Sequence, residues 1–223
     1  MTDRRSADWR ATLRRDDDNR RVQPWLRDRG SLTARLQARG RFSVGLLRQH
    51  LARPTADEAA LLGLRPGVRA RVREVVLRVD GVPVVFAHTV LPCQPRGPLT
   101  RWLARLGTRS LGAMLFAHPG FARGALHYRR LDARHPLHSR ATATLGCTAR
   151  TLWARRSRFV FGRQSVLVTE VFSPRLPVAP GDPSPAQQKS RQAASGRVQS
   201  APLCIAACDA RPRIANLAAP PGA

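Results

Sequence analysis

Alternation of apolar and polar residues marks a series of strands through the middle of the chain. Six segments carry this pattern, at 42–49, 71–79, 82–92, 125–131, 154–162 and 164–174. Asp80-Gly81 joins the second segment to the third, and this dipeptide is typical of a tight hairpin turn. The last two segments form a second predicted hairpin. Consecutive hairpins predict an antiparallel sheet.

Short helices are predicted between the strands. They are expected within 24–40, 54–64, 100–107 and 110–116. Ser31 and Ser110 are candidate N-caps, because a serine hydroxyl accepts hydrogen bonds from backbone N–H groups of the first helical turn. Residues 132–150 are expected to form an irregular connection. Helices placed between the hairpins of an antiparallel sheet predict an α+β domain.

Composition divides the chain into three parts. Residues 1–21 are polar, which predicts a disordered arm, and residues 178–223 are rich in Pro, Ala and Ser without periodicity, which predicts a disordered tail. A single domain is expected at 22–177. The sequence has no run of about 18 apolar residues and no secretory apolar region, so we expect no membrane span and a cytoplasmic location. The four cysteines form no C-x-x-C pair and are expected to be reduced.

The formal net charge of +25 invites a nucleic-acid interpretation, but the distribution of the charges argues against it. Only one lysine, Lys189, occurs among the 39 basic residues, and such an excess of arginine is typical of genome composition bias. The arginines are scattered and aromatic residues reach only 5%, whereas nucleic-acid sites cluster positive charge with stacking aromatics. We therefore expect no nucleic-acid partner, but a general attraction to anions.

Two predicted strands each place one charged residue on an otherwise apolar face. These residues are Arg73 in 71–79 and Glu170 in 164–174. A lone buried charge is costly, so each needs a partner. One interpretation is structural, with ion pairs between the two or with other residues. The other is a pocket, in which Arg73 holds a ligand carboxylate with its planar fork and Glu170 accepts a hydrogen bond from a ligand hydroxyl.

Two further segments are candidates for anion binding. In GTRSLGAML the first unpaired N–H group after Ser110 belongs to Leu111, and a helix N-terminus suits a carboxylate, although an ordinary capped helix is the alternative. LWARRSRF at 152–159 concentrates Arg155, Arg156 and Arg158. These arginines form either a solvated strand start or an electropositive rim.

Metal and nucleophilic chemistry have no signature in the sequence. The six histidines lack carboxylate or cysteine neighbours at ligand spacing, so no metal site is expected. No G-x-S-x-G, G-x-G-x-x-G or Walker pattern occurs.

Five segments of the predicted domain form an ordered set. They are SLTARL at 31–36, REVVLRVDGVPVVFAHTVLP at 73–92, LGTRSLGAMLF at 106–116, LWARRSRF at 152–159 and LVTEVFSP at 167–174. In this order they resemble chorismate lyase, a family of the bacterial ubiquinone pathway. The resemblance covers about residues 22–177. Each motif is weak alone, and their joint order is specific.

The resemblance implies a six-stranded antiparallel sheet with flanking helices and a buried ligand pocket closed by helical flaps. It implies conversion of chorismate to 4-hydroxybenzoate and pyruvate without a metal or organic cofactor. Arg73 and Glu170 would be the catalytic residues, with Arg73 on the ring carboxylate and Glu170 on the ring hydroxyl. Leu32 and Leu111 would also bind the substrate, Leu111 through its backbone. The protein is expected to be a monomer.

The competing class is a non-catalytic, small-molecule-sensing domain. The ligand-binding domain of some bacterial transcription regulators is similar to this fold and shares the Arg…Asp-Gly-x-Pro hairpin pattern. That interpretation predicts a winged-helix DNA-binding domain upstream. Only about 21 residues precede the predicted domain, so the lyase interpretation is favoured.

Overall fold

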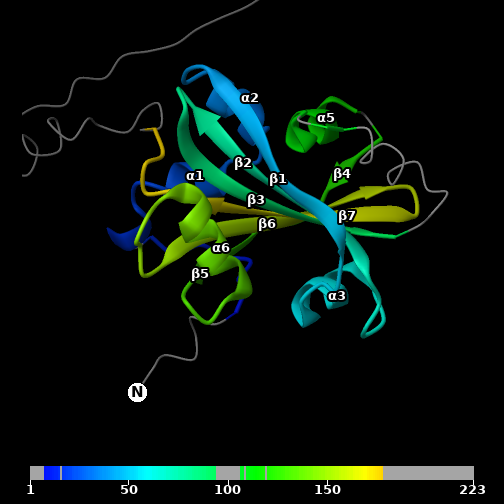
Figure 1. Ribbon diagram of the computed structural model, residues 1–223. Helices are drawn as coiled ribbons and strands as arrows, with labels where there is room; N and C mark the ends of the chain where they lie inside the picture. Colours follow the sequence, from blue (N-terminus) through cyan, green and yellow to red (C-terminus); the bar gives the residue numbers. More distant parts are fainter. Residues whose placement is uncertain (1–7, 16, 94–105, 108, 119, 178–223) are drawn as a thin grey trace, which may run out of the picture. The chain divides into compact units, whose positions relative to one another are not determined.

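The structure, a computed structural model, is built around an antiparallel sheet of seven strands. It describes residues 8–15, 17–93, 106–107, 109–118 and 120–177. The strands are β1 (Phe42–Ala52), β2 (Ala70–Val79), β3 (Val82–Pro92), β4 (Ala122–Arg123), β5 (His127–Leu131), β6 (Leu152–Phe161) and β7 (Gln164–Phe172). Their order is β1-β2-β3-β7-β6-β4, and β5 also pairs with β6 (Figure 1). The predicted α+β class with an antiparallel sheet is confirmed.

Both predicted hairpins are formed. β2 and β3 turn at Asp80 and Gly81, whose φ angles of 51° and 80° are the left-handed pair that a tight hairpin turn requires. β6 and β7 pair down to Phe161 and Gln164. β3 also pairs with β7, so the two hairpins lie side by side and form the middle of the sheet.

The sheet has one strand more than the six that were expected, so that number was wrong. The additional strand is β4, in which only Ala122 and Arg123 pair with β6. Two residues are too few to show the alternation by which a strand is identified in a sequence. β5 occupies the other part of the same edge, opposite residues 152–156 of β6.

Helices cover both faces of the sheet (Figure 1). One face is covered by α1 (Gln23–Arg27), α2 (Leu32–Gln37) and α5 (Leu111–Ala117), and the other by α3 (Ala56–Leu62) and α6 (Pro136–Leu145). A short 3-10 helix, η2 (Asp17–Asn19), precedes α1. The helix expected at 100–107 lies outside the described residues, except for its last two positions.

Helix α6 occupies part of the segment 132–150, so the irregular connection expected there was wrong. Pro136 begins the helix, and Nδ1 of His135 caps it by accepting a hydrogen bond from the backbone N–H of Leu137 at 3.2 Å. Gly146 ends it in the left-handed conformation. Its buried residues recur at helical spacing and are Leu137, His138, Ala141 and Leu145. Burial of this apolar stripe against the sheet stabilises the helix.

The described part of the predicted N-terminal arm packs on the domain. Arg10 forms an isolated bridge with Tyr128 of β5, and Asn19 is fully buried. Within the described part of the arm, Trp9, Leu13 and Asn19 are therefore packed against the domain, whereas most of the other residues are exposed. The tail predicted at 178–223 lies outside the described residues. No helix in the described parts of the chain is long and apolar enough to cross a membrane.

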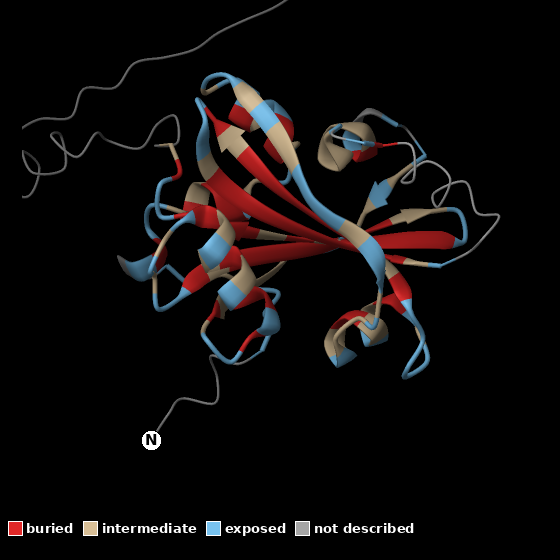
Figure 2. Ribbon diagram, in the orientation of Figure 1, coloured by how far each residue is buried: buried red, intermediate tan, exposed pale blue. Residues whose placement is uncertain are grey.

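Strands β2, β3 and β7 are buried along most of their length, because helices cover them on both sides (Figure 2). On one face, Trp25 and Leu36 of the helices pack with Leu77 of β2. On the other face, Phe86 and Val171 pack with α6. A charged side chain on these strands therefore needs a partner inside the protein.

A network of charged side chains is buried on the face that α3 and α6 cover. His88 lies between Glu74, 2.8 Å from its Nδ1, and Glu58, 3.2 Å from its Nε2. Arg48 and Arg140 also contact Glu74, at 2.5 and 3.0 Å. Burial by itself raises the pKa of Glu74, but hydrogen bonds from His88 and Arg48 lower it to about 2. Burial lowers the pKa of His88, but its hydrogen bonds to Glu58 and Glu74 raise it overall.

We expect the free energy of unfolding to decrease as the pH falls from about 5 to about 2. The pKa of Glu74 is lowered from 4.5 to about 2 by folding, so this carboxylate stabilises the fold above pH 4.5. The contribution, up to about 3 kcal/mol, is lost as the pH falls through the folded pKa. The raised pKa of His88 has the opposite sign, because its contribution is present at low pH and lost as the pH rises.

Denaturant titrations across this pH range measure the effect. Glu74→Gln should flatten the dependence, because the titrating group is gone. Asp18→Asn is the control, since it removes a carboxylate from an exposed ion pair with Arg130 and should leave the slope unchanged. If the free energy of unfolding depends on pH equally in Glu74→Gln and in the wild-type protein, the buried network does not govern stability in acid.

Candidate active site

The register of the sheet places Arg73 and Glu170 on the same face. Arg73 of β2 lies opposite Thr89 of β3, which lies opposite Val168 of β7, two residues before Glu170. Residues two apart on a strand share a face. Arg155 of β6 lies opposite Glu170 and shares this face as well. We refer to it as the Arg73 face.

Helices α2 and α5 both lie over the Arg73 face (Figure 1). Residues of the two helices contact each other there. The hydroxyls of Ser31 and Ser110 cap them by accepting hydrogen bonds from the backbone N–H groups of Ala34 and Ala113, each at 3.3 Å. Both predicted N-caps are confirmed. The Ser110 hydroxyl also lies 2.5 Å from the hydroxyl of Thr33. This hydrogen bond joins the two helices directly.

Leu32 and Leu111 are the first residues of α2 and α5. Leu32 is buried in a cluster with Leu77 of the Arg73 face. Leu111 is partly buried against a cluster that includes Leu115 and Phe159. The structure therefore brings both leucines to the helix pair that covers this face. Their contact with a substrate stays a prediction.

Arg73 is only 2% exposed, yet no carboxylate lies within ion-pair distance of it among the described residues. Its Nη1 donates to Oε1 of Gln49 at 3.4 Å, and its Nη2 donates to the carbonyl of Arg109 at 3.2 Å. Arg109 comes directly before Ser110, so the guanidinium lies beside the start of α5. Burial lowers the pKa of Arg73. The group is thus a buried cation with neutral acceptors.

Glu170 forms an ion pair with Arg155 rather than with Arg73. The distance from Nε of Arg155 to Oε2 of Glu170 is 2.5 Å. Arg155 is fully buried, and its Nη1 also donates to the carbonyls of Trp25 and Asp28, each at 2.6 Å. Glu170 therefore has an ion-pair partner within the protein, as one of the two interpretations of the sequence proposed. Nη2 of Arg155 is buried and has no hydrogen-bond partner among the described residues, which leaves one donor beside this pair.

The three arginines of LWARRSRF point in different directions. Arg155 lies on the Arg73 face, whereas Arg156 lies on the opposite face and pairs with Asp57 at 2.5 Å. Arg158 is exposed. They therefore do not form one common rim. The role of Arg155 as partner of Glu170 was missed because the strand register across the sheet is not visible in the sequence.

Arg123 of β4 is a residue of this region that the sequence did not reveal. Its Nε donates to the hydroxyl of Ser157 at 2.9 Å, and its Nη1 donates to the carbonyl of Arg29, between α1 and α2, at 2.9 Å. Burial and the charge of Arg155 lower the pKa of Arg123 to about 10, although Glu170 acts in the opposite direction. No sequence signal marked Arg123, because β4 is too short to show a pattern.

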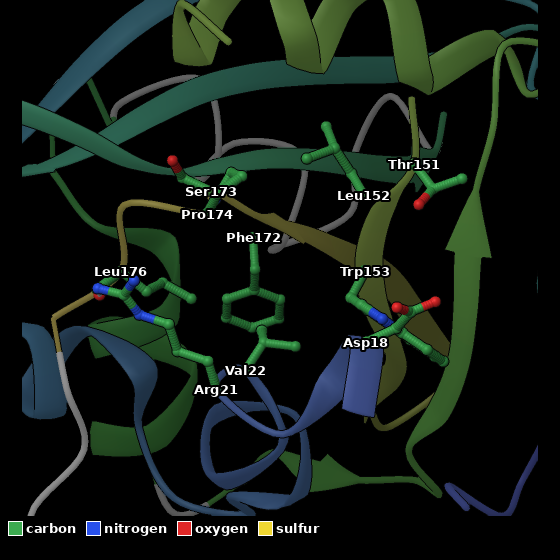
Figure 3. Close-up of a pocket in the computed structure, with 10 residues that line it drawn as sticks. All are labelled: Asp18, Arg21, Val22, Thr151, Leu152, Trp153, Phe172, Ser173, Pro174 and Leu176. Atoms are coloured by element: carbon green, nitrogen blue, oxygen red, sulfur yellow. The ribbon is translucent and has the colours of Figure 1, made fainter. Parts of the chain in front are cut away.

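Two cavities of the structure are lined by other residues than the predicted site residues. One of about 250 Å³ is lined by Asp18, Arg21, Val22, Thr151, Leu152, Trp153, Phe172, Ser173, Pro174 and Leu176 (Figure 3). The other, of about 220 Å³, shares Trp153 with it. Neither is lined by Arg73, Glu170, Leu32 or Leu111. The pocket expected beneath the helices therefore stays a prediction.

Three histidines make contacts that hold the structure together. His88 bridges two buried carboxylates, His135 caps α6, and Nε2 of His138 donates to the carbonyl of Ala149 at 3.1 Å. Within the described residues, no group of three or more His, Cys, Asp and Glu side chains is placed to hold a metal ion.

Solved structures resemble the chain only at the level of a distant fold. PhnF from Mycobacterium smegmatis is 22% identical and covers 66% of this chain and 65% of its own, with a TM-score of 0.49. A GntR-family transcriptional regulator from Enterococcus faecalis V583 is 15% identical and covers 62% and 95%, with a TM-score of 0.42. Likeness at this level carries no functional argument.

Sequence relatives are much closer. The family model described as Chorismate lyase matches residues 6–177. A protein from Dechloromonas aromatica (strain RCB) named "Probable chorismate pyruvate-lyase" is 53% identical over 70% of this chain and 88% of its own. One of the same name from Methylobacillus flagellatus is 47% identical over 74% and 93%. The chain belongs to the chorismate lyase family.

Proposed function

We propose that this protein is a chorismate pyruvate-lyase that converts chorismate to 4-hydroxybenzoate and pyruvate, the first step of ubiquinone biosynthesis. The observation that carries the proposal is Arg73, a buried guanidinium without a carboxylate partner among the described residues, on the same sheet face as Glu170. Chorismate supplies a ring carboxylate for the first and a ring hydroxyl for the second. Family membership supports this choice of ligand.

The proposed binding mode places the ring between the sheet and the helices α2 and α5. Arg73 binds the ring carboxylate, assisted by the backbone N–H of Leu111, which has no acceptor within its own helix. Glu170, held by Arg155, accepts a hydrogen bond from the ring hydroxyl. Leu32 packs against the ring at the edge of the site. Closure by the two helices excludes water.

The reaction requires the protein to orient the substrate and to stabilise the charge that develops in the transition state. The ether bond between ring and side chain breaks, the ring carbon that bears the hydroxyl loses a proton, and the departing enolpyruvate takes up a proton to become pyruvate. The ring becomes aromatic, which supplies much of the driving force. None of these steps needs an electron acceptor or donor outside the substrate. We therefore propose that the reaction needs no cofactor. A cytoplasmic location and a monomeric state stay predictions from the sequence.

Purified protein given chorismate is expected to release pyruvate and 4-hydroxybenzoate in equal amounts with EDTA present. A coupled lactate dehydrogenase assay measures the pyruvate, and chromatography measures the aromatic product. Heat-denatured protein is the control for spontaneous breakdown of chorismate. Binding of chorismate without release of pyruvate would overturn the enzyme proposal and favour a small-molecule-sensing domain.

A further inference from the structure

Arg73 and Ser157 lie at opposite ends of one row of residues across the Arg73 face, and Arg123 contacts the Ser157 end. The row runs from Arg73 through Thr89 and Val168 to Ser157, whose hydroxyl accepts a hydrogen bond from Arg123. Three steps between neighbouring strands, each of about 4.8 Å, separate the ends by roughly 14 Å. The Arg73 face therefore has one arginine on its β2 side and one bound at its β6 side, an arrangement that suits a small anion with two carboxylates.

Charge supports the same conclusion. Arg73, Arg123 and Arg155 bring three positive charges to this region, and Glu170 brings one negative charge that Arg155 already pairs with. Neither Arg73 nor Arg123 has an ion-pair partner among the described residues. Asp28 and Arg29 also act on Arg123, with opposite signs, so Arg73 and Arg123 are two cations available to the two carboxylates of chorismate.

The hydrogen bonds of Arg123 hold it in place and leave one end of its fork available. Nε is bound to Ser157, and Nη1 is bound to the carbonyls of Arg29 and Gly30 at 2.9 and 3.4 Å. Its guanidinium carbon also lies over the ring of Phe116, 5.2 Å from the centroid. Nη2 makes no hydrogen bond with the described residues. Burial and the charge of Arg155 lower the pKa of Arg123 to about 10, against the opposite effect of Glu170 and Asp28.

We propose that Arg123 binds the carboxylate of the enolpyruvyl side chain of chorismate, an inference that rests on the proposed lyase function. Arg73 then holds the ring carboxylate, which substrate and product share. Arg123 holds the second carboxylate, which substrate and pyruvate possess and 4-hydroxybenzoate lacks. Arg123 therefore distinguishes substrate from aromatic product, and it stabilises the negative charge that develops on the departing enolpyruvate.

The test compares two ligands in one variant. Arg123→Gln is expected to lower kcat/KM for chorismate by about 10- to 100-fold, the usual effect of losing a hydrogen bond to a charged group. Its Kd for 4-hydroxybenzoate, measured by calorimetry, should stay within about twofold of wild type. Arg123→Lys keeps the charge without the fork and should lose less activity. Arg158→Gln, on an exposed arginine of the neighbouring strand, is the matched control and should change neither quantity.

Two results would overturn the inference. An equal loss of affinity for both ligands would mean that Arg123 only holds the segment between α1 and α2 in place. Unchanged kinetics in Arg123→Gln would mean that it touches no substrate. Either result leaves the lyase proposal standing if the wild-type protein releases pyruvate, whereas an inactive wild-type protein that binds 4-hydroxybenzoate refutes the lyase proposal itself.

Discussion

Arg73→Gln is expected to lower kcat/KM for chorismate by about 30- to 4,000-fold, which corresponds to about 2–5 kcal/mol. The guanidinium is buried and already bonded to the neutral oxygens of Gln49 and Arg109. In the proposed complex the ligand carboxylate is the negatively charged partner of this guanidinium. Removal of the guanidinium leaves the carboxylate desolvated and unpaired. The affinity for 4-hydroxybenzoate should fall as well, because the product keeps the ring carboxylate.

Steady-state kinetics and calorimetry measure this prediction, and circular dichroism verifies that the variant is folded. Arg69→Gln is the control, because it removes the same charge from an exposed position just before β2. It tests whether the effect comes from general attraction of an anion to a positively charged protein. Near-normal kinetics and product affinity in folded Arg73→Gln would assign Arg73 a structural role.

Arg155→Leu should decrease the free energy of unfolding by about 3–5 kcal/mol, the usual cost of removing one partner from a buried ion pair. Arg155 is fully buried and binds Glu170 together with the carbonyls of Trp25 and Asp28. Leucine leaves all three acceptors without this donor. The loss also disconnects the end of α1 from the sheet and releases Glu170 from its position on the Arg73 face.

Denaturant unfolding measures the stability, and pyruvate release measures the consequence for the site. Arg158→Leu makes the same change at an exposed position of β6 and should stay within about 0.5 kcal/mol of wild type. An Arg155→Leu protein with wild-type stability would show that Glu170 and the two carbonyls find other donors or water.

The hairpins, and the position of Arg73 and Glu170 each on an otherwise apolar face of its own strand, could be predicted from the sequence. Asp80-Gly81 fixes the turn of the first hairpin, and alternation then decides which side chains share a face. An apolar face with a single charge stands out in such a pattern. The sequence left open which partner each charge takes, because strand order and register arise from packing of the whole sheet.

The missed elements have different causes. β4 pairs through only Ala122 and Arg123, so no periodicity identified it or the role of Arg123. Helix α6 did carry a signal, since Pro136 marks a helix start and Leu137, Ala141 and Leu145 recur every fourth residue. The many small or polar residues of this segment favoured a loop in the sequence, whereas burial of Leu137 and Leu145 against the sheet stabilises the helix.

The central claim is that the Arg73 face beneath α2 and α5 holds the substrate. A crystal structure of the protein with 4-hydroxybenzoate tests it most directly. The ligand carboxylate is expected within hydrogen-bond distance of the Arg73 guanidinium, and the phenolic oxygen beside the Glu170 carboxylate. Ligand bound instead in the cavity between Trp153 and Phe172, with Arg73 still on Gln49 and Arg109, would contradict the claim.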